Sequence, residues 1–263
     1  MFRLVENNGI KYYRVDAFEG AAKHCFTTRA GGVSENEFSS MNLRFNCDDK
    51  RENVLKNFDI ICSEIGVNYE DLVLSNQIHE DNVVRVTAKD KGNGIMFPNR
   101  FESADGLICG ERGIPLVTFY ADCVPLMFLD RVNGVIAMSH SGWKGTVKNI
   151  AQKTVDAFLD DYNSKVKDIT VAIGPSIGVC CFEVGDEVAD IFHDIFGDCV
   201  LEKHEKWHVN LQKAVYEELK NAGIPEENIT LPGICTACNS DRLFSHRASG
   251  GKRGNLGAIM ELI

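Results

Sequence analysis

Short runs of apolar residues, some continuous and some alternating with polar ones, recur along most of the chain. Runs of this length and pattern are typical of β-strands that are buried on one or both faces. They predict strands within residues 23–29, 72–79, 83–88, 104–109, 114–121, 125–130, 135–140, 168–175, 228–235 and 256–263.

Between these runs, apolar side chains recur at the three- and four-residue spacing of one helix face. This spacing predicts helices over residues 54–65, 147–158, 188–195 and 211–219. The last of them is followed by Gly223 and Pro225, residues that commonly mark the end of a helix. The fold class is therefore mixed α and β.

Few breaks interrupt this pattern. The longest polar and glycine-containing stretch, residues 88–103, predicts a surface loop, and no proline- or serine-rich linker or fixed-period repeat divides the chain. We expect a single domain over residues 1–263.

Composition and charge narrow the class of protein. The chain has 263 residues, of which 44% are apolar, so it can bury a substantial core. No stretch approaches the roughly 20 apolar residues of a membrane span, and the N-terminal segment lacks the apolar part of a signal peptide. The formal charge of -10 is spread along the chain, which argues against a nucleic-acid partner. We expect a cytoplasmic protein that binds neither membranes nor nucleic acids.

The chain contains ten cysteines, which are expected to stay reduced in the cytosol. Five stand singly among apolar or mixed residues, where a thiol behaves as a small hydrophobic group, and we expect them in the core: Cys25, Cys47, Cys62, Cys109 and Cys199.

Cys235 and Cys238 form a Cys-x-x-Cys pair, which fits half of a zinc knuckle or a redox pair. A structural zinc site usually needs a second such pair, and the adjacent Cys180 and Cys181 have the wrong spacing for one. We therefore expect structural thiols here, with a redox pair or a separate metal site as alternatives.

Asp122 and Cys123 place two ionisable groups in the middle of the segment FYADCVPLMFLD, which is otherwise typical of a buried strand. The residues that follow predict a β-hairpin with strands at 125–130 and 135–140. A four-residue loop that pairs Leu129 with Gly134 places Cys123 opposite His140. A tighter two-residue turn places Cys123 opposite Lys144 instead, and we prefer the first register.

A cysteine that faces a histidine has three interpretations. The pair can be a nucleophile and its base, as in thiol hydrolases, or two ligands of a zinc ion. It can equally be a core thiol beside a hydrogen-bonded histidine. A third ligand favours the metal, and His79 is the best candidate because it ends the predicted strand 72–79. His204 and His208 compete weakly, since their surroundings are polar. Spacing alone leaves these alternatives open.

Several segments, in one order along nearly the whole chain, resemble the YfiH/FAMIN-like family, long labelled multicopper polyphenol oxidases or laccases. They are FTTRAGGVS, SMNL, ADCVPLMFLD, SHSGWKGT, IGPSIGVCCFEVGDEV and the C-terminal CTACNSDRLFSHRASGGKRGNLGAIMEL. The resemblance implies an α+β fold, namely a single-domain mixed β-sheet sandwich flanked by helices (CNF/YfiH-like).

The same resemblance implies a zinc-dependent purine nucleoside phosphorylase. Its substrates would be phosphate with adenosine, inosine, guanosine or methylthioadenosine, and it would also deaminate adenosine. The implied metal ligands are His79, Cys123 and His140, and the implied catalytic residues are Cys123, His140 and Asp122. Asp122 is a candidate for proton transfer or for orienting Cys123, with capping of a turn as the alternative. Copper follows from the family label, but the chain has only seven scattered histidines, too few for multicopper chemistry.

Polar residues of the matching segments are expected to line the pocket for nucleoside and phosphate. They are Arg29, Asn42, Lys144, Arg247 and Arg253, and the forked guanidinium of arginine suits a phosphate oxyanion. Arg44 departs from the family pattern, which has glycine there, so pocket shape or substrate choice is expected to differ on that side.

We expect a monomer or a weak homodimer. Two other functions compete with the phosphorylase. One is a metal-free thiol hydrolase, similar to an amidase or deamidase, that uses Cys123 and His140. The other is a metal-binding scaffold protein without turnover.

Overall fold

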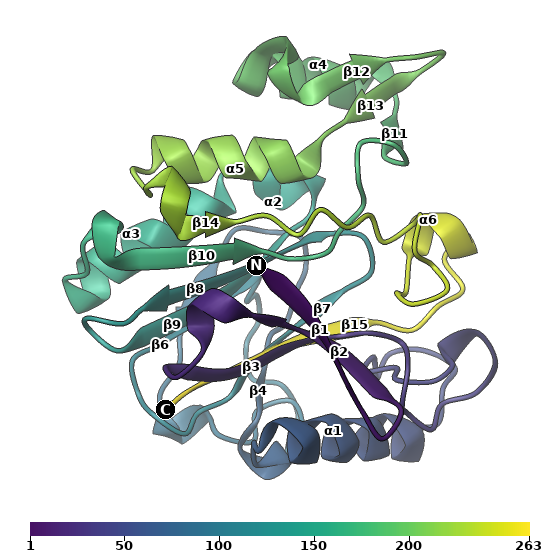
Figure 1. Cartoon of the computed structure of the whole chain (residues 1–263), viewed down its shortest axis with the longest axis vertical. Helices are drawn as coiled ribbons and strands as arrows, with labels where there is room; N and C mark the ends of the chain where they lie inside the picture. Colours follow the sequence, from purple (N-terminus) through teal and green to yellow (C-terminus); the bar gives the residue numbers. More distant parts are fainter.

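The computed structural model describes residues 1–263, and its strands form two six-stranded sheets that pack face to face (Figure 1). The first sheet has the order β1 (Phe2–Asn7), β2 (Ile10–Val15), β3 (Ala22–Thr27), β15 (Leu256–Leu262), β7 (Leu116–Tyr120) and β4 (Val73–Leu74). The second has the order β14 (Ile229–Thr230), β10 (Ile169–Ile173), β8 (Val124–Asp130), β9 (Val135–Ser141), β6 (Gly106–Cys109) and β5 (Val83–Arg85).

Helices cover the outer faces of both sheets (Figure 1). Helix α1 (Arg51–Ile65) packs on the first sheet. The second sheet is covered by α2 (Trp143–Val147), α3 (Ile150–Tyr162), α4 (Asp186–Phe196) and α5 (Leu211–Asn221). A small sheet of β11 (Glu183–Val184), β13 (Trp207–Val209) and β12 (Leu201–Lys203) lies beside α4, and the short α6 (His246–Ser249) precedes β15.

The alternation of side chains along the central strands explains this layering. On β8, Met127 and Leu129 pack into the core between the sheets, whereas Leu126 and Phe128 pack against the helices. A strand that is buried on both faces reads as a continuous apolar run, because successive side chains point to opposite sides. The predicted fold class, an α+β arrangement of sheets flanked by helices, is therefore confirmed.

The predicted hairpin forms, but its register was wrong. Asp130 pairs with Val135 and Pro125 pairs with His140, so the loop is shifted by one residue along the chain. The reason is a local turn: Asp130 Oδ1 accepts hydrogen bonds from the backbone amides of Val132 (2.8 Å) and Asn133 (3.1 Å). An aspartate that caps its own turn in this way fixes where the strand ends.

Other local expectations were also wrong. The apolar run at residues 72–79 forms strand only at β4, so His79 lies in a loop rather than at a strand end. Strands β1, β2 and β11–β13 were not predicted. Cys25, Cys62 and Cys109 are buried as expected, but Cys199 is exposed, because the neighbouring Val200 takes the buried position in this turn. None of the helices combines the length and apolarity needed to span a bilayer.

Helix α5 buries a carboxyl group on its apolar face, which gives a prediction for stability. Glu218 is 5% exposed, and its Oε2 has no hydrogen-bond partner. Burial raises its pKa from 4.5 to about 9. Because the folded pKa lies above the unfolded one, stability is highest below about pH 4.5 and falls as the pH rises towards 9.

We expect Glu218→Gln to stabilise the protein by about 3 kcal/mol at pH 7 and by almost nothing at pH 4. Denaturant unfolding at several pH values measures this difference. Glu217→Gln, a change at the partly exposed neighbouring position, is the control and should alter stability little at either pH. A Glu218→Gln effect that is independent of pH would contradict the prediction.

Candidate active site

A cavity of about 810 Å³ opens where the first sheet meets the loops on either side of it. Its size falls within the range of small-molecule sites. The lining combines aromatic rings, amide side chains and cations, and it includes Arg44, Phe45, Arg51, Gln77, His79, Asn99, Phe119, Cys123, His140, Arg253 and Asn255. Part of it comes from the loop predicted at residues 88–103, through Met96 and Pro98.

Three metal-ligand side chains meet at one end of this cavity. The ligand atoms of His79, Cys123 and His140 all lie within 4.8 Å of one another. His140 is on β9, Cys123 immediately precedes β8, and His79 belongs to the loop after β4. The structure thus brings together the three residues that were expected to share a metal ion.

Gly142 provides the space in which these side chains meet. With Pro125 opposite His140, Cys123 comes opposite Gly142 rather than opposite the histidine. A Cβ atom at residue 142 would lie 3.0 Å from Cys123 Sγ and 3.0 Å from His79 Nδ1. The absence of a side chain here therefore allows the thiol and the imidazole to converge.

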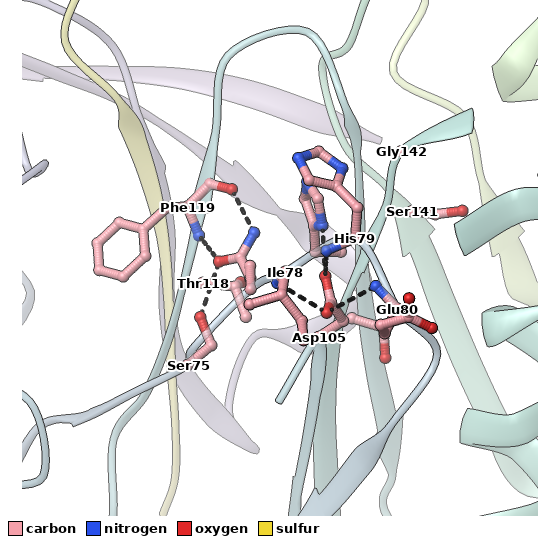
Figure 2. A network of polar contacts seen from close by, with 12 residues as sticks. Ser75, Ile78, His79, Glu80, Asp105, Thr118, Phe119, Ser141 and Gly142 are labelled. Carbon is pink, nitrogen blue, oxygen red and sulfur yellow. Dashed lines mark hydrogen bonds and ion pairs between the residues drawn. The ribbon is translucent and has the colours of Figure 1, made fainter. Parts of the chain in front are cut away.

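Asp105, at the start of β6, organises both histidines (Figure 2). Its buried carboxylate accepts hydrogen bonds from the backbone amides of Ile78 (3.0 Å), His79 (3.1 Å) and Glu80 (3.0 Å). The same carboxylate lies 2.9 Å from Nδ1 of His140. Burial raises the pKa of Asp105, but the hydrogen bonds from His140 and the backbone outweigh this and lower it, so the group is ionised.

These contacts explain the backbone of the His79 loop. His79 has φ of 63°, in the left-handed region that non-glycine residues seldom adopt. Three successive amides that point at one carboxylate hold the loop in this conformation. Gln77 fixes the other end, because its side-chain amide bonds both the N–H (2.7 Å) and the carbonyl (2.8 Å) of Phe119. Figure 2 shows this second network beside Ser75 and Phe119.

The two imidazoles differ in their electrostatic surroundings. Burial lowers the pKa of His140, but its interactions with Cys123 and with the Asp105 carboxylate outweigh this and raise it to about 9. Burial and the nearby charge of His140 lower the pKa of His79, which keeps that ring neutral. A neutral imidazole is the form that binds a metal ion.

The donor set fits a single zinc ion. Two imidazoles and one thiolate are ligands that zinc prefers, and three protein ligands are typical of a catalytic zinc site with one open position. Asp105 bonds Nδ1 of His140, which leaves Nε2 free to face the cavity. A carboxylate behind a ligating histidine is the usual partner at such sites.

Asp122 lies beside Cys123 but does not line the cavity. Its Oδ1 accepts a hydrogen bond from Thr236 Oγ1 (2.6 Å), and its Oδ2 accepts one from the backbone amide of Arg247 (2.7 Å). The backbone of Asp122 has φ of 94°, and its carbonyl accepts the amide of Ile177 (2.8 Å). With both carboxylate oxygens engaged, the residue joins three segments around Cys123.

Of the five expected pocket residues, only Arg253 lines the cavity. Its Nε is buried without a partner, and Nη2 lies 3.5 Å from His246 Nδ1. Burial lowers the pKa of Arg253, and the nearby positive charge of Arg44 lowers it further. Arg44 and Arg253 therefore place two positive charges in the lining of the same cavity.

The other four residues are placed around the cavity rather than in its lining. Arg29 donates to the carbonyls of Ser39 and Ser240, and Arg247 donates to those of Cys181 and Glu183. Lys144 is exposed, with its ammonium 5.6 Å from the centre of the Trp143 ring.

Asn42 is buried and bridges the two arginine-bearing segments of the cavity. Its Oδ1 accepts the backbone amides of Arg44 (2.9 Å) and Asn255 (3.0 Å). Because Asn255 follows Arg253 closely, this one side chain sets the spacing between Arg44 and Arg253.

Sequence reasoning missed most of the residues around the cavity, among them Arg51, Gln77, Asp105 and Asn255. The only available signal for Asp105 was a carboxylate at the start of an apolar strand, where a buried charge is unusual. Arg44 was noticed as an unusual residue, and the structure places it in the cavity wall.

Comparison with known proteins identifies the family. Residues 23–263 match the model of the family described as multi-copper polyphenol oxidoreductase laccase. The chain belongs to this family. Among its relatives in the family is purine nucleoside phosphorylase YlmD of Bacillus subtilis, which is 33% identical over 236 residues, covering 88% of this chain and 85% of the relative.

Solved structures of this laccase-labelled family have the same fold. The hypothetical protein YfiH of Bacillus licheniformis has a TM-score of 0.93 and 30% identity, with 100% of this chain and 99% of that chain covered. YlmD of Geobacillus stearothermophilus has a TM-score of 0.91 and 31% identity, with 99% and 98% covered. The resemblance that the sequence motifs indicated is therefore confirmed, and the family is one associated with metals.

Proposed function

We propose that this chain is a zinc-dependent purine nucleoside phosphorylase. In the proposed reaction, phosphate adds to C1′ of the ribose, and the purine leaves with the electron pair of the glycosidic bond and takes up a proton. The substrates are adenosine, inosine, guanosine and methylthioadenosine. The proposal rests mainly on one observation: His79, Cys123 and His140 converge in a cavity that also contains two arginines. The names of relatives such as YlmD support the choice of substrate class.

Phosphate recognition is assigned to Arg253 together with Arg44. Two neighbouring guanidinium groups repel each other, and an oxyanion between them relieves this repulsion while accepting forked hydrogen bonds. The buried, unpaired Nε of Arg253 is a donor that such an anion satisfies. Asn42 keeps the two segments at a fixed separation.

The nucleoside would occupy the remaining part of the cavity. Phe45, Phe97 and Phe119 give it apolar surfaces, and Gln77, Asn99 and Asn255 give it amide groups. Purines are flat and carry donors and acceptors at their edges, so rings and amides together are suited to bind them.

We propose that the same site deaminates adenosine. A zinc ion held by His79, Cys123 and His140 would supply Lewis acidity, which lowers the pKa of water enough for hydrolysis near neutral pH. Asp105 holds His140 in the tautomer whose Nε2 faces the cavity, and Asp122 holds the backbone that presents Cys123.

The donor set favours zinc over copper despite the family description. Multicopper oxidation requires further histidine-rich groups, and the one other group of close metal-ligand residues in this chain consists of four cysteines. We assign the protein to the cytoplasm and propose that it works as a monomer or weak homodimer.

Purine release is expected to require phosphate and to yield ribose 1-phosphate from adenosine and inosine, and 5-methylthioribose 1-phosphate from methylthioadenosine. The assay incubates the purified protein with adenosine, inosine and methylthioadenosine, with and without phosphate, and identifies the products by mass spectrometry. Equal release of base without phosphate, with free ribose as the product, would identify a hydrolase. Formation of inosine from adenosine in phosphate-free buffer measures deamination separately.

A metal-free thiol hydrolase is the second candidate, and one observation favours it. Asp105, His140 and Cys123 are arranged in the order of a catalytic triad, with an acid behind the imidazole and the thiol in front. Metal analysis with iodoacetamide labelling separates the two proposals. Stoichiometric zinc that is lost in Cys123→Ala supports the phosphorylase, whereas metal-free protein that is rapidly alkylated at Cys123 supports the hydrolase.

A further inference from the structure

Four cysteines from two distant segments meet outside the cavity. Cys180 and Cys181 lie between β10 and β11, and Cys235 and Cys238 follow β14. Their four sulfur atoms all lie within 4.8 Å of one another. The Sγ of Cys238 is 3.5 Å from that of Cys180 and 3.5 Å from that of Cys181. The expectation that the adjacent pair has the wrong spacing to join Cys-x-x-Cys was therefore wrong.

The backbone explains why adjacent cysteines can take part. Ser176 and Cys235 form a parallel bridge, and the amide of Thr236 donates to the carbonyl of Ser176 (2.9 Å), so the two segments run side by side. A Cβ atom at Gly178 would lie 3.1 Å from Cys235 Cβ and 3.2 Å from Cys180 Sγ. Glycine at this position lets the Cys180 segment turn closely around Cys235.

The sulfur separations suit a shared metal ion rather than disulfides. A disulfide bond is about 2.05 Å long, whereas Cys238 Sγ lies 3.5 Å from the sulfur atoms of Cys180 and Cys181. Four sulfurs at about 2.3 Å from a tetrahedral zinc ion lie about 3.8 Å from each other. The observed distances therefore need only small side-chain adjustments to enclose one ion.

We propose that Cys180, Cys181, Cys235 and Cys238 bind a structural zinc ion as a tetrathiolate site. Four thiolates in tetrahedral arrangement are the donor set of closed, structural zinc sites. This site is separate from the cavity and has no open position, so it takes no substrate.

Groups around the cluster favour thiolate ligands. The amide of Gly178 donates to Cys235 Sγ (3.1 Å). The guanidinium of Arg247, which donates to the carbonyls of Cys181 and Glu183, offsets part of the negative charge of a zinc tetrathiolate.

The proposed ion would hold in place the segments that surround Cys123. Asp122 is bonded by Thr236, by the amide of Arg247 and, at its carbonyl, by Ile177. All three partners belong to the segments that the four cysteines join or to α6 next to them. The structural zinc thus supports the backbone that presents a ligand of the cavity site.

Zinc analysis of purified, desalted protein tests this proposal. We expect about two zinc ions per chain in the parent protein. The double variant Cys180→Ser/Cys238→Ser should lose about one of them, and Cys123→Ala should lose the other. Cys199→Ser removes an exposed cysteine outside both groups and should retain both equivalents. One equivalent that is lost only in Cys123→Ala would overturn the tetrathiolate site and leave the phosphorylase proposal intact. If Cys123→Ala keeps one equivalent of zinc and the double variant loses one, the tetrathiolate site is supported whether or not the cavity binds zinc.

A second measurement on the parent protein avoids variants that fail to fold. Native protein is treated with iodoacetamide, with and without a strong zinc chelator, and labelled cysteines are mapped by mass spectrometry. Cys180 and Cys238 are exposed, so we expect protection that the chelator removes, whereas exposed Cys199 reacts in both cases. The proposal would be overturned if all three cysteines were labelled alike without the chelator. It would also be overturned by iron in place of zinc or by a disulfide within the cluster.

Discussion

Asp105→Ala is expected to weaken metal binding and to destabilise the fold. The change removes the acceptor of three backbone amides and of His140 Nδ1 at once. Each unsatisfied buried donor costs about 1–3 kcal/mol, and partial access of water reduces the sum, so we expect a loss of roughly 3–6 kcal/mol. Loss of the carboxylate behind a ligating histidine lowers metal affinity about 10- to 100-fold.

Two variants and one control separate positioning from general stability. Asp105→Asn keeps the size and one acceptor oxygen, so it should retain more stability than Asp105→Ala while still weakening zinc binding. Asp130→Asn is the matched control, because Asp130 is also buried and caps backbone amides, but in the hairpin turn. Zinc affinity by chelator competition, beside denaturant unfolding, gives the two readouts. If Asp130→Asn weakened zinc binding as much as Asp105→Asn, the positioning role would be refuted.

Arg253→Ala is expected to impair phosphorolysis far more than deamination. A lost charge-assisted hydrogen bond corresponds to about 1.5–3 kcal/mol, so the KM for phosphate should rise roughly 10- to 150-fold. Deamination uses no phosphate and should change much less. Arg44→Gly, which removes the second guanidinium group from this wall of the cavity, should also raise the phosphate KM. Steady-state kinetics of both reactions, with a thermal melt of each variant, measure these effects.

Arg247→Ala is the control for this prediction, because it removes an arginine that does not line the cavity. Its guanidinium bonds two backbone carbonyls and does not line the cavity, so its loss should lower stability without a selective effect on the phosphate KM. Parallel loss of both activities in Arg253→Ala at unchanged stability would rule out the assigned contact with phosphate.

The sequence pattern predicted the strands and helices that are continuous and strongly apolar. β8, β9, β10 and β15 are buried on both faces, and such runs stand out from their neighbours. The N-terminal hairpin of β1 and β2 was missed because its residues are largely polar or half-buried. The strands of the small sheet have two or three residues each, too few to produce a period.

The ligand residues could be found from chemistry, but their geometry could not. His79, Cys123 and His140 are unusual residues at the ends of apolar runs, and segments that resemble the family include Cys123 and His140. The register error shows the limit: the aspartate cap at residue 130 moved the loop by one residue and the partner of Cys123 by two, yet Cys123 and His140 still converge because Gly142 leaves room. Asp105 is 26 residues from His79 and 35 from His140, so no local spacing connects them.

A substitution at Gly142 can test whether a metal ion needs space between the donor atoms of the site as well as the donor atoms themselves. Its φ of -72° is one that alanine adopts without strain, so a methyl group can be added without disturbing the chain direction. That methyl would point between Cys123 Sγ and His79 Nδ1, each 3.0 Å away. Gly142→Ala keeps every donor and every charge of the site, and fills the volume between them with carbon. The variant therefore blocks the space sterically, whereas replacement of a metal-ligand residue changes the donor atoms and the volume together.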